Sequence, residues 1–127
     1  MLDTANLVAF LATARPDESK SFYREKLGLL LVEDDNNHIV FDSNGTLLRI
    51  QRVPSHTPSG NIALSWEVDN ILSTVASLRA AGIQFERMPG LEQDQNGIWV
   101  AYDGTMVAWF KDPDGNLLSL SEHAERP

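Results

Sequence analysis

The sequence contains no cysteine and few basic residues. Its 127 residues include 10 Lys and Arg against 18 Asp and Glu, which gives a formal net charge of −8. Without cysteine, the chain cannot form disulfides, thiolate zinc sites or iron–sulfur clusters, and it has no cysteine nucleophile. The excess of negative charge disfavours nucleic acid and anionic membrane surfaces as partners.

Long hydrophobic runs and a leader pattern are also missing. The apolar runs are much shorter than the roughly 18 residues that a membrane-spanning helix needs. The first residues, Met1–Thr4, lack a basic stretch followed by an apolar one. With 43% hydrophobic residues, the composition can supply a core for a single domain over residues 1–127. We therefore expect a cytoplasmic protein that binds neither membranes nor nucleic acid.

The first half of the chain predicts one helix among four strands. An apolar run at 5–12 is followed by Pro16, which favours the first turn of a helix, and Gly28 marks the helix end. Three strand-like segments follow, separated by clusters of turn-forming residues, at 29–32, 38–41 and 46–50. Residues 4–52 are thus predicted to form a β-α-β-β-β module, and the proline-containing segment 53–60 to be a connector.

The same order of elements recurs in the second half. A strand at 62–68 precedes a helix for which Asp69 is the expected N-cap and Gly82 the C-terminal signal. The pattern places four apolar residues on one face of this helix: Ile71, Leu72, Val75 and Leu78. Further strands are expected at 83–87, 98–102, 106–111 and 117–121, with an exposed loop at 88–97. The second module then spans 61–122, and residues 123–127 form a frayed tail.

The predicted fold class is α+β, with two tandem β-α-β-β-β modules. Each curved mixed sheet must bury one face on its helix, so we expect the other faces to line a shared cavity. The helix ends support a duplication, because Leu27-Gly28-Leu29 and Ala81-Gly82-Ile83 stand at corresponding places.

Two motifs are the most specific features of the chain. The first helix ends in Phe22-Tyr23-Arg24-Glu25-Lys26-Leu27-Gly28-Leu29, and Asp112-Pro113-Asp114-Gly115-Asn116 precedes the last strand. The second motif is expected to shape a tight turn rather than to take part in chemistry. With both motifs at these places in a duplicated unit, nearly the whole chain resembles the vicinal oxygen chelate superfamily, the glyoxalase, bleomycin resistance protein and extradiol dioxygenase group. The likeness implies the glyoxalase/bleomycin resistance-like fold and a homodimer.

Enzymes of that superfamily hold a divalent ion through His and Glu side chains on the first and last strands of each half. The resemblance places these ligand positions on Asn61, Ser119 and Arg49, and on or next to Val8. None of these side chains is a usual ligand, and the guanidinium of Arg49 would repel a cation. We therefore expect no metal and no cofactor. The three histidines are scattered, and only His38, beside an acidic turn, offers an alternative centre for a rebuilt site.

The period of two residues in a strand predicts which side chains face the cavity. The apolar residues Ile62, Leu64, Trp66 and Val68 are assigned to the helix side. The polar candidates for ligand binding lie on three strands: Arg49 and Gln51, then Asn61, Ser65 and Glu67, then Ser119 and Ser121.

These candidates allow two interpretations of Arg49. It can form a polar floor that holds a carboxylate or carbonyl group, or it can pair with Glu67 inside the protein. Trp99 and Tyr102 flank the long loop and are the aromatic candidates for the pocket, whereas Trp66 is assigned to the core.

The sequence leaves several functions open. The preferred one is a metal-free protein that binds a small organic molecule and catalyses no reaction, and the charge of −8 suits a cationic or amine-bearing ligand. The alternative is a glyoxalase-type metal-dependent lyase or isomerase, or a dioxygenase, with atypical ligands. A metal-independent enzyme that uses Arg49 and Glu67 is a further possibility. No catalytic residue is identified, and the missing metal ligands favour the first function.

Overall fold

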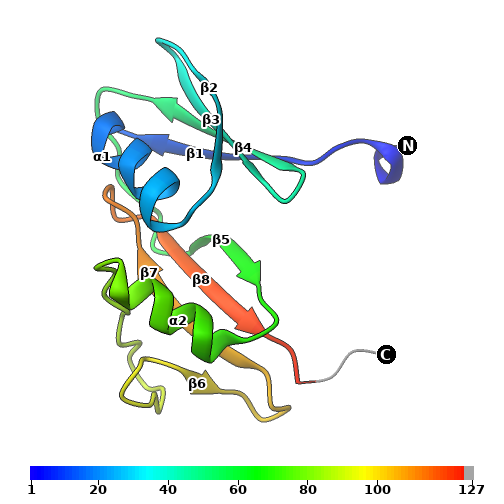
Figure 1. Cartoon of the computed structure of the whole chain (residues 1–127), viewed down its shortest axis with the longest axis vertical. Helices are drawn as coiled ribbons and strands as arrows, with labels where there is room; N and C mark the ends of the chain where they lie inside the picture. The colour runs from blue at the N-terminus through cyan, green and yellow to red at the C-terminus, as the bar shows by residue number, and fades with distance from the viewer. Residues whose placement is uncertain (125–127) are drawn as a thin grey trace. The chain divides into compact units, whose positions relative to one another are not determined.

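The computed structural model describes residues 1–124 (Figure 1). The chain divides into two compact units, Met1–Thr57 and a second unit that begins at Pro58. The boundary lies inside the predicted connector 53–60, which contains no helix or strand. Of the expected tail at 123–127, residues 125–127 lie outside the described part of the chain.

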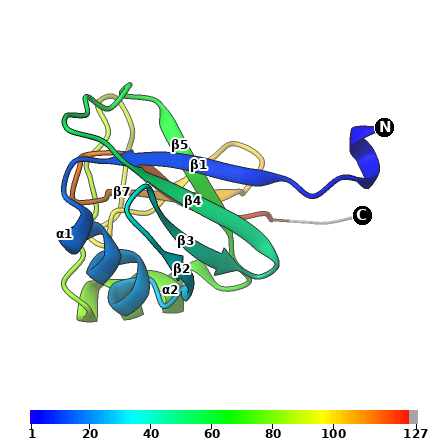
Figure 2. The same cartoon turned by 90° about the horizontal axis from the view of Figure 1, so that it is seen from above.

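The first unit is one mixed sheet with a helical segment on one face (Figure 2). Its strands are β1 (Val8–Thr13), β2 (Leu30–Asp34), β3 (His38–Ser43) and β4 (Thr46–Arg52). The strand order is β1-β4-β3-β2, with β1 and β4 parallel and the other neighbours antiparallel. A short 3-10 helix, η1 (Leu2–Thr4), precedes β1. Between β1 and β2, helix α1 (Pro16–Ser21) continues into a π-helical turn, η2 (Phe22–Lys26).

Local sequence accounts for both ends of this helical segment. Pro16 occupies the first turn, where its missing N–H costs no hydrogen bond, and Asp17 and Glu18 favour the positive end of the helix dipole. Gly28 follows the segment with a φ of +76°, a left-handed conformation that glycine adopts without strain. The predicted start and end are confirmed, whereas the π-helical turn was not predicted.

The core of the first unit lies between the helical segment and the sheet. Tyr23 and Phe41 are both fully buried, and their ring centroids lie 5.9 Å apart. At the end of β1, Oγ1 of Thr13 shares a buried 2.7 Å hydrogen bond with Oγ of Ser19 in α1. Alternate strand residues therefore face the helix, and the residues between them form the opposite side of the sheet.

An ion cluster ties β2 to α1 and β4. The carboxylate of Asp34 accepts hydrogen bonds from Nζ of Lys20 at 2.8 Å and from Nη2 of Arg52 at 2.6 Å. The Lys20 ammonium, together with the Arg52 guanidinium, holds the pKa of Asp34 below its usual value. A carboxyl group with a lower pKa in the folded state stabilises the fold above its unfolded pKa, and this contribution is lost as the pH falls through the folded pKa.

We expect Asp34→Asn to lower the free energy of unfolding at neutral pH by about 1 kcal/mol or less, because the ion pairs are only partly buried. The difference between wild type and variant should shrink below about pH 4, where the carboxyl of the unfolded chain takes up its proton. Urea denaturation of both proteins at neutral and acidic pH measures this difference. If the difference in free energy of unfolding between the two proteins did not change with pH, the stabilising role of the Asp34 carboxylate would be contradicted.

The second unit repeats the arrangement of the first (Figure 1). Its strands are β5 (Ile62–Glu67), β6 (Trp99–Val100), β7 (Met106–Lys111) and β8 (Leu117–Glu122). The order β5-β8-β7-β6, with β5 and β8 parallel, copies the topology of the first sheet. Helix α2 (Ile71–Ala80) lies across the sheet in contact with β7 and β8. The predicted α+β fold with two tandem modules is confirmed.

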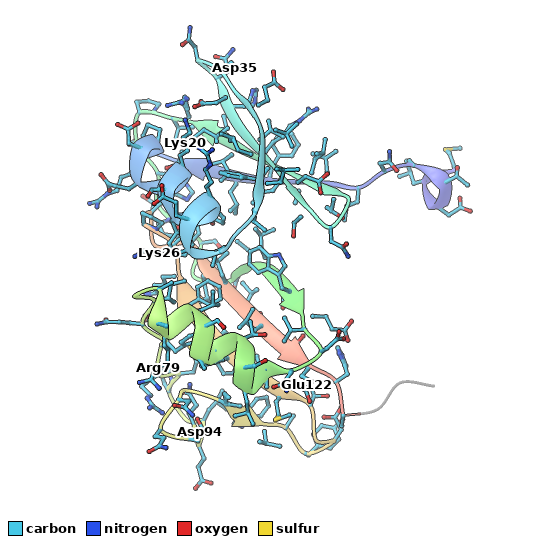
Figure 3. The ribbon with its side chains drawn as sticks, viewed as in Figure 1. Lys20, Lys26, Asp35, Arg79, Asp94 and Glu122 are labelled. Atoms are coloured by element: carbon cyan, nitrogen blue, oxygen red, sulfur yellow. The ribbon has the colours of Figure 1, made fainter. Side chains whose placement is uncertain are left out.

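The start of α2 is held by two polar side chains. Asn70, rather than the predicted Asp69, is the N-cap, and its Oδ1 accepts a 3.1 Å hydrogen bond from the Ser73 N–H. Oε1 of Glu122, which lies at this end of α2 in Figure 3, accepts the Ile71 N–H at 2.8 Å. This bond places the helix on the same side of the sheet as the side chain of Glu122.

Two other expectations for the second unit were wrong. Leu72 is 58% exposed. The buried side of the helix carries Ile71, Val75 and Leu78, at i, i+4 and i+7, and Leu72 lies outside this stripe. The segment 83–87 is not a strand, and in it only Phe85 forms a bridge, with Phe110 of β7. β6 pairs with Met106 and Val107 of that edge, and further along it the segment adds one backbone hydrogen bond, from the Glu86 N–H to the carbonyl of Trp109.

The core of this unit is aromatic. Phe110 is fully buried, with Trp66 stacked on it at a centroid distance of 6.5 Å and the edge of Phe85 at 5.5 Å. Trp66 therefore packs on the helix side, as predicted. No helix within residues 1–124 is both long and apolar enough to cross a membrane.

Candidate functional site

We call the side of the first sheet that faces away from α1 the first open face. Strand register arranges its residues in rows across the sheet. The central row is Phe10, Arg49, Val40 and Glu33, with Val8, Leu47, Asp42 and Leu30 on one side and Ala12, Gln51 and His38 on the other.

Arg49 stands at the centre of the first open face. Its side chain is exposed and forms no hydrogen bond or ion pair with any other residue of the first unit. Its neighbours are Phe10, which is 57% exposed, and the buried Val40, and Gln51 is exposed two residues further along β4. A guanidinium beside an exposed ring and an amide can bind a carboxylate or carbonyl group while a planar group packs on Phe10.

The second open face is the corresponding side of the second sheet, away from α2. It also consists of rows: Ile62, Leu117 and Lys111, then Ser65, Ser119 and Trp109, then Glu67, Ser121, Val107 and Trp99. The predicted alternation holds for Ser65, Glu67, Ser119 and Ser121.

Ile62 departs from that alternation because β5 contains a bulge. Ile62 pairs with Leu117 and Leu64 pairs with the next residue of β8, so that Ala63 is the extra residue. The bulge reverses the alternation and places Ile62, 50% exposed, on the second open face rather than on the helix side. Asn61 precedes the strand and is exposed.

The middle row of the second open face combines hydroxyl and indole groups. Ser119 is 2% exposed, and its Oγ donates a 2.8 Å hydrogen bond to Oγ of Ser65. Trp109 lies beside Ser119 and is also buried, and its ring centroid is 6.1 Å from that of Trp99. Because Ser119 and Trp109 are buried, Trp99 and Ser65 are the members of this group that a ligand can reach.

The end of this face brings together residues that the sequence left apart. The carboxylate of Glu67 pairs with Nδ1 of His123, a residue that was assigned to the tail. Such a bond orients the imidazole and occupies Glu67 within its own unit. Tyr102 lies in the nearby β6–β7 turn with a fully exposed side chain, so it is not part of the second open face.

The long loop at 88–97 is anchored by two side chains that sequence reasoning missed. Oε1 of Gln93 accepts the Met88 N–H at 2.6 Å, and its Nε2 donates to two backbone carbonyls at 2.9 and 2.8 Å. The guanidinium of Arg87 donates to backbone carbonyls of residues 93–95 at 2.6 to 3.4 Å. No local pattern marks these bonds, because they join residues that only the loop closure brings together.

The same loop borders a pocket of about 410 Å³ within the second unit. Its lining includes Pro58, Met88, Pro89 and Leu117 as apolar groups and Glu86, Arg87 and Lys111 as charged ones. None of these residues was a candidate from the sequence.

Comparison with known proteins agrees with this architecture. A family model described as Glyoxalase/Bleomycin resistance protein/Dioxygenase superfamily matches residues 4–120. No curated protein matches the sequence.

Several solved structures share the fold. Lactoylglutathione lyase from Agrobacterium tumefaciens is 17% identical with a TM-score of 0.73, covering 94% of this chain and 93% of that one. A glyoxalase/bleomycin resistance protein/dioxygenase from Alicyclobacillus acidocaldarius is 18% identical with a TM-score of 0.72, covering 96% and 93%. The glyoxalase family protein from Enterococcus faecalis is 24% identical with a TM-score of 0.67, covering 92% and 94%. At these identities the likeness concerns the fold alone.

The positions at which the resemblance places metal ligands carry unsuitable groups. Val8 has no side-chain atom that can bind a metal, and Arg49 is a cation. The hydroxyl of Ser119 is hydrogen-bonded to that of Ser65. Asn61 offers a neutral amide before β5 begins. In the part of the chain that the structure describes, no group of three or more His, Asp and Glu side chains is placed to hold a metal ion. These residues therefore do not fit a divalent ion.

Proposed function

Because the chain belongs to the glyoxalase/bleomycin resistance protein/dioxygenase superfamily but carries unsuitable groups at the expected ligand positions, we propose that it binds a small organic molecule without a metal ion. The position of Arg49 is the observation that best supports this proposal. A guanidinium at the centre of an open sheet face, without a hydrogen bond or ion pair to the other residues of the first unit, repels a divalent cation and attracts a carboxylate or carbonyl group.

The open faces suggest the chemistry of the ligand. Arg49 and Gln51 suit a carboxylate or carbonyl group, and Phe10 offers a surface for a planar apolar part. On the second open face, the half-buried Trp99, which packs beside the buried Trp109, offers a further surface of this kind. The net charge of −8 draws positively charged molecules toward the protein, so a ligand that also bears an amine suits it best.

We expect Arg49→Ala to weaken binding of a ligand found by a thermal-shift screen at least tenfold, or about 1.4 kcal/mol, because a charge-assisted hydrogen bond is lost. The variant should remain folded, since the Arg49 side chain contacts solvent. Calorimetric titration measures the affinity, and Arg24→Ala serves as the matched control because Arg24 is exposed on η2. Equal affinities of wild type and Arg49→Ala would contradict a role for this face.

Metal content tests the other part of the proposal. Elemental analysis of the untagged protein and titration with nickel, zinc, manganese and iron(II) should detect no stoichiometric tight site. One tightly bound ion per chain would contradict the proposal and favour the alternative, a glyoxalase-type lyase or isomerase, or a dioxygenase, with atypical ligands.

Assembly as a homodimer is part of the same proposal, and sedimentation velocity measures it. We also predict that the two modules share a cavity and that the protein is cytoplasmic. We expect a dimer at micromolar protein concentration, and a monomer under those conditions would contradict this part.

A further inference from the structure

The pocket beside the long loop has apolar walls and three charged residues, Glu86, Arg87 and Lys111. The guanidinium of Arg87 is already bonded to backbone carbonyls of the loop, which leaves Glu86 and Lys111 as the charged pair that faces a ligand. Nζ of Lys111 lies 3.7 Å from Oε1 of Glu86, and the two side chains are 52% and 36% exposed. This separation exceeds the 2.7 to 2.9 Å of a charge-assisted hydrogen bond by about 1 Å. Neither side chain forms a hydrogen bond with any residue of the described chain. Both charged groups therefore keep free bonding capacity toward the pocket.

The pocket wall is held in place before any ligand arrives. The side chain of Gln93 holds the backbone at Glu86 and Met88 through hydrogen bonds. The guanidinium of Arg87 holds the other side of the loop through the carbonyl of Asp94. On the other side, a Cβ at Gly115 would lie 3.2 Å from Cγ of Pro58, so that glycine at this position lets Pro58 pack closely. A wall that is already ordered costs less conformational entropy on binding.

The charge pattern selects the class of ligand. A simple anion that approaches Lys111 also meets the carboxylate of Glu86, and a simple cation that approaches Glu86 meets the ammonium of Lys111. Only a molecule that carries both charges a few ångströms apart satisfies both groups. The volume of about 410 Å³ lies in the lower part of the range for small-molecule pockets.

We propose that this pocket binds a zwitterionic small molecule of the α-amino acid type. The ligand carboxylate accepts hydrogen bonds from Lys111, the ligand ammonium donates to Glu86, and an apolar side chain packs against Met88 and Pro89. All residues that line the pocket belong to the second unit, whereas Arg49 belongs to the first. It does not depend on the function proposed above.

The first test titrates L-leucine into the full-length, isotope-labelled protein and follows amide chemical shifts. We expect saturable shifts confined to residues 58–60, 86–89 and 111–117. Leucinamide lacks the carboxylate and 4-methylpentanoate lacks the ammonium, so each should bind at least tenfold more weakly than L-leucine. Absence of saturable shifts with L-leucine, L-methionine and L-phenylalanine would overturn the proposal, and so would equal binding of the two analogues.

The second test removes each charge from the protein. Lys111→Met and Glu86→Gln should each weaken L-leucine binding at least fivefold, because each leaves one charged group of the ligand without its partner. Lys26→Met is the matched control, since Lys26 is exposed on η2 in the other unit, and it should bind L-leucine as wild type does. Unchanged binding by both pocket variants would overturn the proposal. If a variant fails to fold, as circular dichroism shows, the analogue comparison on wild type still decides the matter.

Discussion

Replacement of Phe110 by alanine is expected to lower the free energy of unfolding by about 3 to 5 kcal/mol. Phe110 is fully buried, and it contacts Trp66 and Phe85 on the helix side of the second sheet. Truncation removes both ring contacts and leaves a cavity that rigid neighbours cannot fill. Guanidinium denaturation followed by far-ultraviolet circular dichroism measures the loss.

Loss of Phe110 should also disturb the pocket in the same unit. The backbone of Phe110 forms a β-bridge with Phe85. Glu86, which follows Phe85 in the chain, donates its N–H to the carbonyl of Trp109 at 2.8 Å. The ring of Phe110 also packs against that of Phe85, the residue before Glu86, so its loss removes side-chain support from this segment. Phe10→Ala is the matched control, because Phe10 is 57% exposed and its truncation should cost less than about 1 kcal/mol. Similar losses in the two variants would contradict this account of the core.

Asp112→Ala is expected to cost about 2 to 4 kcal/mol, although the change removes no apolar contact. Asp112 is 6% exposed, and its Oδ1 accepts the N–H groups of Asp114 at 3.0 Å and Asn116 at 2.9 Å. Its Oδ2 accepts Nδ2 of Asn116 at 2.8 Å. Without the carboxylate, these donors lose their partner in a buried turn, which is costlier than the same loss in water. Urea denaturation measures the change.

Asp103→Ala separates the effect of burial from that of turn geometry. Oδ1 of Asp103 also accepts a backbone N–H two residues later, that of Thr105 at 2.9 Å, but this turn is exposed. Solvent can replace the lost acceptor there, so the cost should stay near 1 kcal/mol or below. If both aspartates gave equal losses, burial would not be the reason for the large effect at Asp112.

Much of the architecture follows from short-range signals. Pro16 and Gly28 bound the first helix because one favours the first turn and the other adopts a positive φ. Polar turn residues separate the strands, and the motif at 112–116 forms the tight turn that it predicts. These signals depend on neighbours in the chain, so the order of elements and the duplication can be inferred without a tertiary structure.

The candidate site was predictable only in part. Alternation places Ser65, Glu67 and Ser119 on one side of the second sheet, because a strand repeats every two residues. It fails for Ile62, since one extra residue at Ala63 shifts the register and no residue type announces a bulge. A prediction from periodicity holds only as far as the pairing stays regular.

Other features depend on contacts between residues far apart in the chain. Glu67 meets His123 because parallel pairing brings the ends of β5 and β8 together. The pocket forms because the segment at 86–89 and the turn after Lys111 lie near Pro58 once the second sheet has folded. Helix limits and strand alternation follow from local conformational preference, whereas these contacts depend on register and loop closure, which only the assembled sheet defines.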